Sequence, residues 1–314
     1  MEKNKMANQT FAALKEACQD NDYACDFAVI NKSYAKDMEW SVFLYVSWKM
    51  YSTRRAPFFV VVPQKQENLF FERFSVELES GVIDQLPFFL TEEDVLKESN
   101  IEIPEHYTGW HIQQIIKLCF SKTRFARDYL TLDSAMIFSR AFDYKSLFSE
   151  EGFICTAAQP VTKIDFFDHY RSVGEKGWLK GVLVSLADSL EEICVFMDNE
   201  TYKTHWYIGG NGFFNSSLLA GLENYAREKG VNGFVGLIDI APYEFAWYGE
   251  YVYMKNRERF SPKGPLITVP ILSLDDLHDL DEKKLNMSED RYGFLFQPPA
   301  SESIKISKII ELYS

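Results

Sequence analysis

The sequence is short of positive charge and has no long apolar run. Of 314 residues, 33 are Lys or Arg and 46 are Asp or Glu, which gives a formal net charge of −13 at pH 7. A general nucleic-acid-binding protein needs a basic surface, so we predict no nucleic-acid partner. No stretch approaches the ~18 consecutive apolar residues of a membrane-spanning helix. The N-terminal MEKNKMANQT also lacks the apolar core of a signal peptide.

Cysteine is sparse and shows no metal-binding or redox spacing. The five cysteines are Cys18, Cys25, Cys119, Cys155 and Cys194. None belongs to a C-x-x-C pair, so neither a structural zinc site nor a redox motif is indicated. An odd number of unpaired cysteines is typical of a reducing compartment, and we therefore predict a cytoplasmic protein.

Glycine is missing after the first predicted strand. Residues 26–30 form a short apolar strand, and residues 31–37 contain no glycine. A nucleotidyltransferase would normally carry a glycine-rich phosphate loop there, so this class is the weaker candidate. A helix over residues 37–51 and a continuous apolar strand over residues 57–63 follow. This order predicts an α/β fold with a mostly parallel central sheet flanked by helices.

Low-complexity linkers and internal repeats are absent as well. The composition, 46% hydrophobic and 25% charged, is ordinary for a globular protein. We predict an N-terminal helical appendage over residues 1–22 and a single domain over residues 23–314. The acidic residues 275–282 should be solvated. Residues 304–313 mix lysine with isoleucine and either dock on the domain or contact a membrane surface peripherally; we favour docking.

Residues 109–143 combine features that favour an anion-binding site. One face of a predicted helix carries Ile112, Ile115, Ile116 and Cys119, and the opposite face carries Trp110, Gln113, Gln114 and Lys117. A basic run then supplies Lys122, Arg124 and Arg127, and an apolar strand over residues 129–132 ends at Asp133. Singly, a polar helix face is usually solvated and a strand-ending Asp is usually a turn residue. Together they predict a ligand at the carboxyl end of a strand.

The second half contains a loop and a helix that are rich in aromatic residues. Gly209, Gly210 and Gly212 alternate with aromatics and Asn211 over residues 205–214, which permits close backbone approach and stacking. Short strands are predicted over residues 153–157 and 192–197.

After Pro242, a predicted helix presents Tyr243, Trp247 and Tyr251 on one face and Glu244 and Tyr248 on the adjoining one. A Glu in the first turn often only offsets the helix dipole, but a carboxylate here could also act as a general base.

The order of these motifs resembles that of bacterial glycosyltransferases with the A-type, or GT-A-like, fold. The resemblance rests on Ser-Tyr-x-x-Asp at residues 33–37, on GW-x-x-QQ-x-x-KL with its strand ending in Asp and an apolar-Phe-x-Arg-x-Phe tail, and on PYEFxWYG at residues 242–249. The sequence is similar to a small family of bacterial glycosyltransferase-like proteins that is linked to surface polysaccharide. The resemblance implies a nucleotide-diphospho-sugar transferase fold, with a donor half over residues 23–145 and an acceptor half over residues 146–314.

The resemblance also implies roles for individual residues. The implied reaction moves a sugar from a nucleotide-sugar donor to a glycan or other hydroxyl acceptor. Residues expected at the donor are Ser33, Tyr34, Asp37, Trp110, Gln113, Gln114, Lys117 and Asp133. Glu244 is the expected general base, and the residues expected at the acceptor are Trp247, Tyr248, Gly210 and Asn211. A helix-capping role for Ser33 or Asp37 is an equal alternative.

One position departs from the family pattern. An Asp-X-Asp turn normally holds manganese or magnesium with the sugar diphosphate, and here Asp133 is followed by Ser134 and Ala135. Hard divalent cations prefer carboxylate oxygens, so Asp133 is the remaining metal ligand and weak metal binding is expected. The alternative function is a non-catalytic module that binds a nucleotide-sugar or glycan and has lost its metal site.

Overall fold

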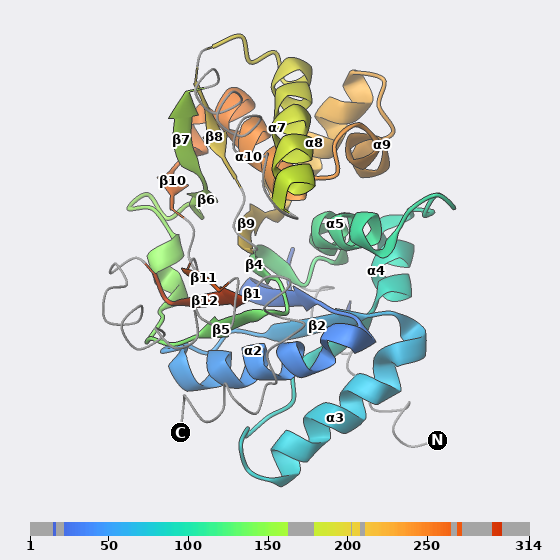
Figure 1. Cartoon of the computed structure of the whole chain (residues 1–314), viewed down its shortest axis with the longest axis vertical. Helices are drawn as coiled ribbons and strands as arrows, with labels where there is room; N and C mark the ends of the chain where they lie inside the picture. The colour runs from blue at the N-terminus through green and yellow to red at the C-terminus, as the bar shows by residue number, and fades with distance from the viewer. Residues whose placement is uncertain are drawn as a thin grey trace.

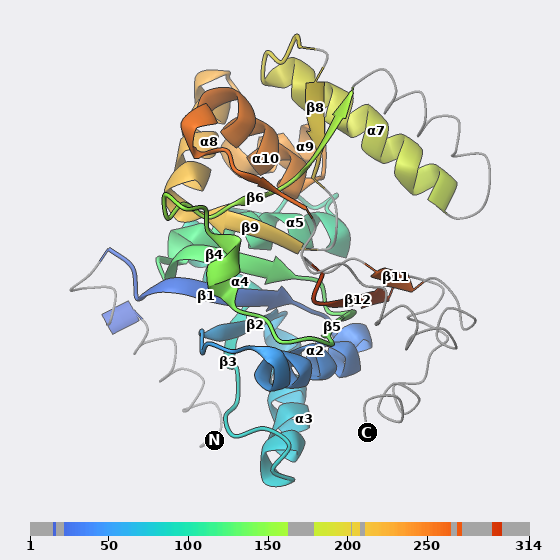
Figure 2. The same ribbon diagram turned by 90° about the vertical axis from the view of Figure 1, so that its left-hand side faces the viewer.

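The protein is built around a five-stranded sheet, with order β3-β2-β1-β4-β9 (Figures 1 and 2). The computed structural model describes residues 15–16, 22–162, 179–201, 203–207, 211–264, 269–271 and 291–296. Most of the expected appendage at residues 1–22, the acidic residues 275–282 and the tail at residues 304–313 lie outside the described residues. Among the described residues, no helix combines the length and apolar character that crossing a membrane requires.

Four strands of the sheet are parallel and one is antiparallel. The strands are β1 (Cys25–Lys32), β2 (Phe58–Val62), β3 (Phe88–Thr91), β4 (Ala126–Leu132) and β9 (Asn211–Asn215). The chain moves outward from β1 to β3 and then returns to place β4 beside β1, whereas β9 pairs antiparallel with β4. The strand order therefore reverses between β1 and β4, and the crevice at their carboxyl ends is where ligands of such sheets bind.

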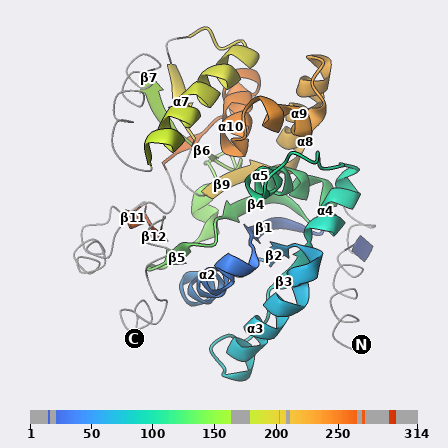
Figure 3. The ribbon, with the colours of Figure 1, turned by 45° about the vertical axis from the view of Figure 1, so that its right-hand side comes forward.

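Helices cover both faces of this sheet (Figures 2 and 3). One apolar cluster joins the sheet to α2 (Met38–Tyr51) and α3 (Glu67–Glu79). The other face packs against α5 (Gly109–Cys119) and, from the second half, α8 (Ser216–Glu228), α9 (Gly233–Ile240) and α10 (Glu244–Lys255). The single-domain prediction for residues 23–314 stays a prediction, but these contacts tie elements of both halves to one sheet.

Short elements complete the described chain. The further helices are α4 (Glu92–Ser99), α7 (Leu179–Phe196), η1 (Ala35–Asp37), η2 (Gln64–Gln66), η3 (Phe120–Thr123), η4 (Tyr144–Leu147) and η5 (Arg257–Arg259). Three strands, β5 (Met136–Phe138), β12 (Gly293–Phe296) and β11 (Val269–Ile271), form a small sheet. Two strand pairs remain: β6 (Thr156–Ala157) with β10 (Pro262–Lys263), and β7 (Gln159–Thr162) with β8 (Lys203–Trp206).

Local sequence explains the ends of several helices. The Thr91 hydroxyl accepts a hydrogen bond from Asp94 N at 3.0 Å and so caps α4. In the same way Asn215 accepts from Leu218 N at 3.1 Å and starts α8, and Gly230, with φ +82°, follows that helix in a left-handed conformation. Neither Ser33 nor Asp37 makes a side-chain cap: Asp37 stands at the N-cap position of α2 without capping it.

The strand predicted over residues 192–197 was wrong. These residues form the last turns of α7 and the residue after it. A short apolar run is ambiguous between strand and helix, and here the buried positions follow helical spacing: Leu186, Leu190, Ile193 and Met197. The strand predicted over residues 153–157 is reduced to the two residues of β6.

Candidate functional site

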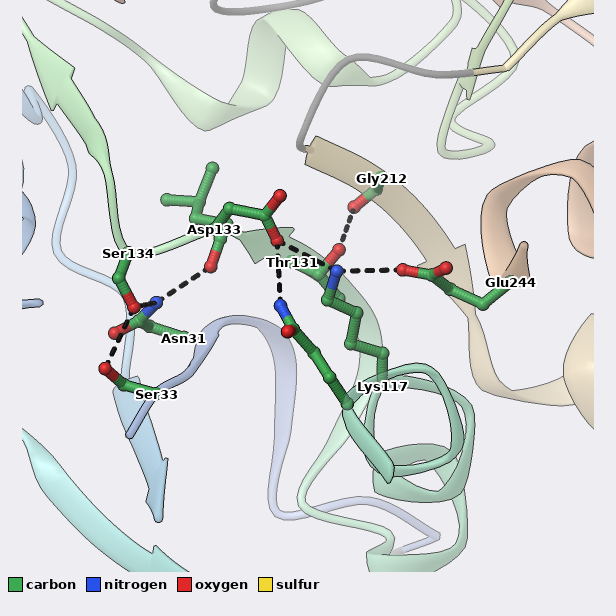
Figure 4. Close-up of polar contacts among 10 residues, drawn as sticks. Asn31, Ser33, Lys117, Thr131, Asp133, Ser134, Gly212 and Glu244 are labelled. Carbon is green, nitrogen blue, oxygen red and sulfur yellow. Dashed lines mark hydrogen bonds and ion pairs between the residues drawn. The ribbon is translucent and has the colours of Figure 1, made fainter. Parts of the chain in front are cut away.

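Three charged side chains from different elements meet at the carboxyl end of β4 (Figure 4). Asp133 follows the last residue of β4, Lys117 extends from α5, and Glu244 opens α10. Lys117 Nζ donates to Asp133 Oδ1 at 2.9 Å and to Glu244 Oε1 at 2.8 Å. We call Asp133, Lys117 and Glu244 the ion triad. We predicted Lys117 and Asp133 at the donor and Glu244 in the same cleft as Asp133, and the fold brings Glu244 to Lys117 from 127 positions away.

The ion triad lies largely out of water. The side chains of Lys117 and Glu244 are each 3% exposed, whereas that of Asp133 is 34% exposed. Burial alone would lower the pKa of Lys117, but attraction by Asp133 and Glu244 outweighs it and holds that pKa above its ordinary value. Burial raises the pKa of Glu244, and Lys117 offsets this only in part. Lys117 is therefore a firmly protonated cation between two acids.

Two amides and an indole extend the ion triad. Gln113 Nε2 donates to Asp133 Oδ1 at 3.2 Å. With its nitrogen oriented toward the acid, Gln114 donates to Glu244 Oε1 at 2.8 Å and accepts from Trp110 Nε1 at 3.0 Å. The Trp110 side chain is exposed and meets the Tyr243 ring edge-on, with centroids 5.4 Å apart. Apart from the exposed Trp110, the face of α5 that was predicted to be polar is thus hydrogen-bonded within the protein rather than solvated.

A hydroxyl and amide network lies beside the ion triad, at the end of β1. Asn31 Nδ2 donates to Leu132 O at 2.9 Å and to Ser134 Oγ at 3.2 Å. The Ser134 hydroxyl donates in turn to Ser33 Oγ at 2.9 Å. Ser33, predicted at the donor, is buried within this network, which links the ends of β1 and β4. Sequence reasoning missed Asn31, although a polar residue that ends a buried strand is a usable signal.

Tyr34 and Lys32 lie at the same edge of the sheet. The Tyr34 hydroxyl donates to Gly109 O at 2.7 Å, at the start of α5. Lys32, which sequence reasoning missed, is buried, pairs with Glu92 Oε1 at 2.8 Å and lies 3.4 Å from the Tyr34 ring centroid. Burial lowers the pKa of Lys32 to about 8. The structure thus brings most residues predicted at the donor together near the carboxyl ends of β1 and β4: Ser33, Tyr34, Asp133 and the residues on α5.

The basic run is not part of this site, which corrects the expectation that it would help to hold an anion. Lys122, Arg124 and Arg127 lie around the start of β4, whereas Asp133 follows its end. A seven-residue strand spans roughly 20 Å, so these cations lie at the opposite end of β4 from Asp133. Lys122 pairs there with Glu223 at 2.7 Å, and Arg127 pairs with Asp128 at 3.1 Å.

Three of the residues expected at the acceptor are buried. Trp247 is fully buried and donates from Nε1 to Ala241 O at 2.7 Å, and the buried Tyr248 hydroxyl accepts from Asn215 N at 3.0 Å. Both side chains are therefore enclosed by the protein itself. Asn211 begins β9 opposite Leu132 and is buried, and Gly210 lies outside the described residues. The aromatic residues near the ion triad include Phe245, whose ring centroid lies 4.7 Å from Lys117 Nζ, and the Trp110–Tyr243 pair.

One family model matches part of the sequence. A family model described as a family of unknown function, DUF6492, matches residues 27–174, slightly less than half of the chain. No curated protein matches the sequence.

Solved structures similar to this chain include glycosyltransferases. The bifunctional glycosyltransferase WbbM, in its apo form, aligns at a TM-score of 0.50 with 11% identity, over 86% of this chain and 45% of that one. The galactosyltransferase LgtC, in complex with donor and acceptor sugar analogues, aligns at 0.48 with 12% identity over 91% and 94%. Mouse xyloside xylosyltransferase 1 aligns at 0.41 with 10% identity over 89% and 99%.

At these sequence identities the structural similarity is evidence for the fold alone. The likeness to WbbM and the strand order together show a mixed α/β fold of the GT-A glycosyltransferase type, with a mostly parallel sheet flanked by helices. The fold class predicted from the sequence is confirmed.

Proposed function

We propose that the protein transfers a sugar from a nucleotide-sugar donor to a glycan or another hydroxyl acceptor. The observation that carries the proposal is the ion triad, which brings a buried cation and two carboxylates together at the point where the strand order reverses. The motif resemblance extends the proposal to surface polysaccharide synthesis in a bacterial cytoplasm.

The donor would lie along the edge formed by the ends of β1 and β4. Ser33, Tyr34 and Asp37 stand at the β1 end, where we assign the base and ribose. We place the diphosphate near Lys117 and Asp133. A nucleoside diphosphate leaves with developing negative charge, and a fixed cation in a water-poor site stabilises that charge more strongly than it would in water.

Glu244 is the residue we assign as the general base. A base works best when its pKa lies close to the working pH, and burial raises the pKa of Glu244 in that direction. Beside it, the exposed Trp110 ring and the partly buried Tyr243 ring offer apolar surfaces on which a sugar ring could stack. We therefore assign the sugar acceptor to Trp110 and Tyr243.

A second candidate function is a binding module without turnover. It is favoured by Ala135, which offers no carboxylate, and by the engagement of Glu244 with both Lys117 and Gln114. Such a module would bind a nucleotide-sugar or a glycan in the same crevice.

A donor panel separates the two candidates. Purified protein is incubated with UDP-, GDP-, ADP- and CMP-linked sugars, with and without manganese, and the released nucleotide is measured beside calorimetric binding. Transferase activity predicts release that Glu244→Gln lowers by about 10²–10⁴-fold while donor affinity is nearly kept. Asp133→Asn should weaken donor binding instead.

Glu223→Gln is the matched control, because Glu223 is also buried and paired with a lysine but lies outside the crevice. Binding without release supports the module. Neither binding nor release with any donor contradicts both candidates.

A further inference from the structure

The turn after β4 does not fit the metal site that the family resemblance implies. Asp133 is the only carboxylate in the turn. The Ser134 hydroxyl is engaged with Asn31 and Ser33. Ala135 presents a methyl group, and its carbonyl accepts from Phe296 N at 2.8 Å. Within the described part of the chain, no group of three or more His, Cys, Asp or Glu side chains is arranged to hold a metal ion.

The other carboxylate within reach, Glu244, is already satisfied. A divalent cation that joined Asp133 to Glu244 would need to lie about 2.0–2.6 Å from an oxygen of each. Lys117 Nζ occupies that position, at 2.9 Å from Asp133 Oδ1 and 2.8 Å from Glu244 Oε1 (Figure 4). Gln113 and Gln114 add N–H donors to the same two carboxylates. Both carboxylates are thus surrounded by N–H donors, as expected where they bind an ammonium group rather than a metal ion.

We propose that Lys117 is the resident cation of this site and that the donor diphosphate is held without a divalent metal. The identity of the ligand, a donor diphosphate, rests on the proposed function. The position of Lys117 between the two carboxylates does not. An ammonium group has three N–H donors. Two of them go to Asp133 and Glu244, which leaves one for a phosphate oxygen. The Phe245 ring, with its centroid 4.7 Å from Nζ, keeps one side of the ammonium apolar.

Manganese alone tests the cation. Mn²⁺ is titrated into the protein and followed by electron paramagnetic resonance and calorimetry. Wild type should show no site tighter than millimolar. Lys117→Ala vacates the space between two carboxylates and should bind Mn²⁺ at least tenfold more tightly, whereas Lys117→Arg keeps a cation there and should gain nothing. A wild-type site as tight as that of Lys117→Ala would overturn the inference.

A second variant keeps the test decisive if Lys117→Ala does not fold, since removing the cation leaves two buried acids uncompensated. Ala135→Asp restores the Asp-X-Asp pattern while Lys117 stays in place. If Lys117 fills the position of the metal, Ala135→Asp changes Mn²⁺ affinity by less than about twofold. If Ala135 alone had impaired a metal site, the same variant would raise the affinity tenfold or more, and the inference would be wrong.

Nucleotide binding then separates this inference from the proposed function. UDP, GDP and ADP are titrated in EDTA and in manganese. The inference is supported if nucleotide affinity in the two media agrees within about twofold. Lys117→Met should also lower that affinity tenfold or more, whereas Lys122→Met should keep it. Lys122 is a suitable control because its partner, Glu223, lies at the other end of β4. Binding that needs manganese overturns the inference and leaves the proposed function standing. Binding in neither medium contradicts the proposed function, and the Mn²⁺ titration still decides the identity of the cation.

Discussion

Asn211 is a buried amide whose two polar atoms have no hydrogen-bond partner among the described residues. It is 1% exposed and lies at the start of β9, opposite Leu132. Asn31, on the other side of Leu132, has an amide that is fully engaged with Leu132, Ser134 and Ser41. Unpaired buried amides are costly, and natural proteins keep few of them. The contrast marks Asn211, which we predicted at the acceptor, as a buried polar position that the protein itself does not satisfy.

Replacing Asn211 should therefore stabilise the protein. Asn211→Leu removes a desolvated amide and should raise the free energy of unfolding by about 1–2 kcal/mol, whereas Asn31→Leu should lower it by a similar amount or more. Urea unfolding followed by fluorescence measures both variants. If Asn211 also binds the acceptor, the stabilised variant loses transfer. A destabilised Asn211→Leu would show that the amide is satisfied in solution.

His205 gives the protein a predictable weakness toward acid. The ring packs edge-on against Tyr253 and Phe260, and burial, with a smaller contribution from Arg257, lowers the His205 pKa from 6.5 to about 4. Between those pH values the unfolded chain binds a proton that the folded chain does not. Stability is therefore lost as pH falls from 6.5 toward 4, by about 1–3 kcal/mol.

The measurement is the difference in unfolding free energy between wild type and His205→Phe across that pH range. The variant keeps a ring in the pocket and removes the titrating group, so its stability should fall less on acidification. His106→Phe, which changes an exposed histidine, is the matched control variant. Parallel curves for wild type and His205→Phe would contradict the assignment.

At the scale of elements, the contact between β9 and α10 positions Glu244. Gly212 on β9 lies under Phe245, the residue next to Glu244, and a Cβ at Gly212 would stand 2.3 Å from that ring. The Phe245 ring has little room to move, because it stacks on Phe214 and carries Lys117 on its face. Because Gly212 has no side chain, the N-terminus of α10 can lie this close to the sheet.

Gly212→Ala should consequently damage both stability and the ion triad. Overpacking of this kind costs about 1–3 kcal/mol, and the displaced helix end should weaken the Lys117–Glu244 contact and lower transfer. Gly109→Ala is the comparison, because its Cβ would come no closer than 3.4 Å to Tyr34 and should change stability little. Unfolding curves and donor turnover of the two variants decide the matter; equal effects would show that α10 adjusts freely.

The elements that the sequence predicts well are those whose signals are local. The apolar run of β2, the cap of α8 at Asn215 and the apolar stripe of α5 each depend on neighbouring residues only. The burial of Lys117 depends on Glu244, which no spacing rule connects to it. The burial of Trp247 and Tyr248 was not predictable for the same reason, since an aromatic helix face does not reveal whether a core or a ligand covers it.

At the scale of the whole molecule, the second half completes the sheet that the first half begins. β9 covers the outer edge of β4, and α8, α9 and α10 bury one face of the same apolar cluster. A fragment that ends at residue 174, where the family match ends, lacks these elements. It would expose an unpaired strand edge and a large apolar surface.

We therefore expect residues 23–174 to fail as an independent unit. Circular dichroism should show no cooperative thermal transition, and light scattering should show aggregation, whereas the full chain gives one transition and one species. A soluble fragment with a cooperative transition would show that the first half folds alone and does not need β9.

The place of β9 also affects how the protein is made. About 80 residues separate the end of β4 from the start of β9. At roughly 5–20 residues per second, a ribosome needs on the order of 4–16 s to synthesise that stretch. Throughout this interval β4 has finished but its outer edge has no native partner. The nascent chain must therefore be shielded or kept unpaired for several seconds, and slowing translation before residue 211 should increase its dependence on chaperones.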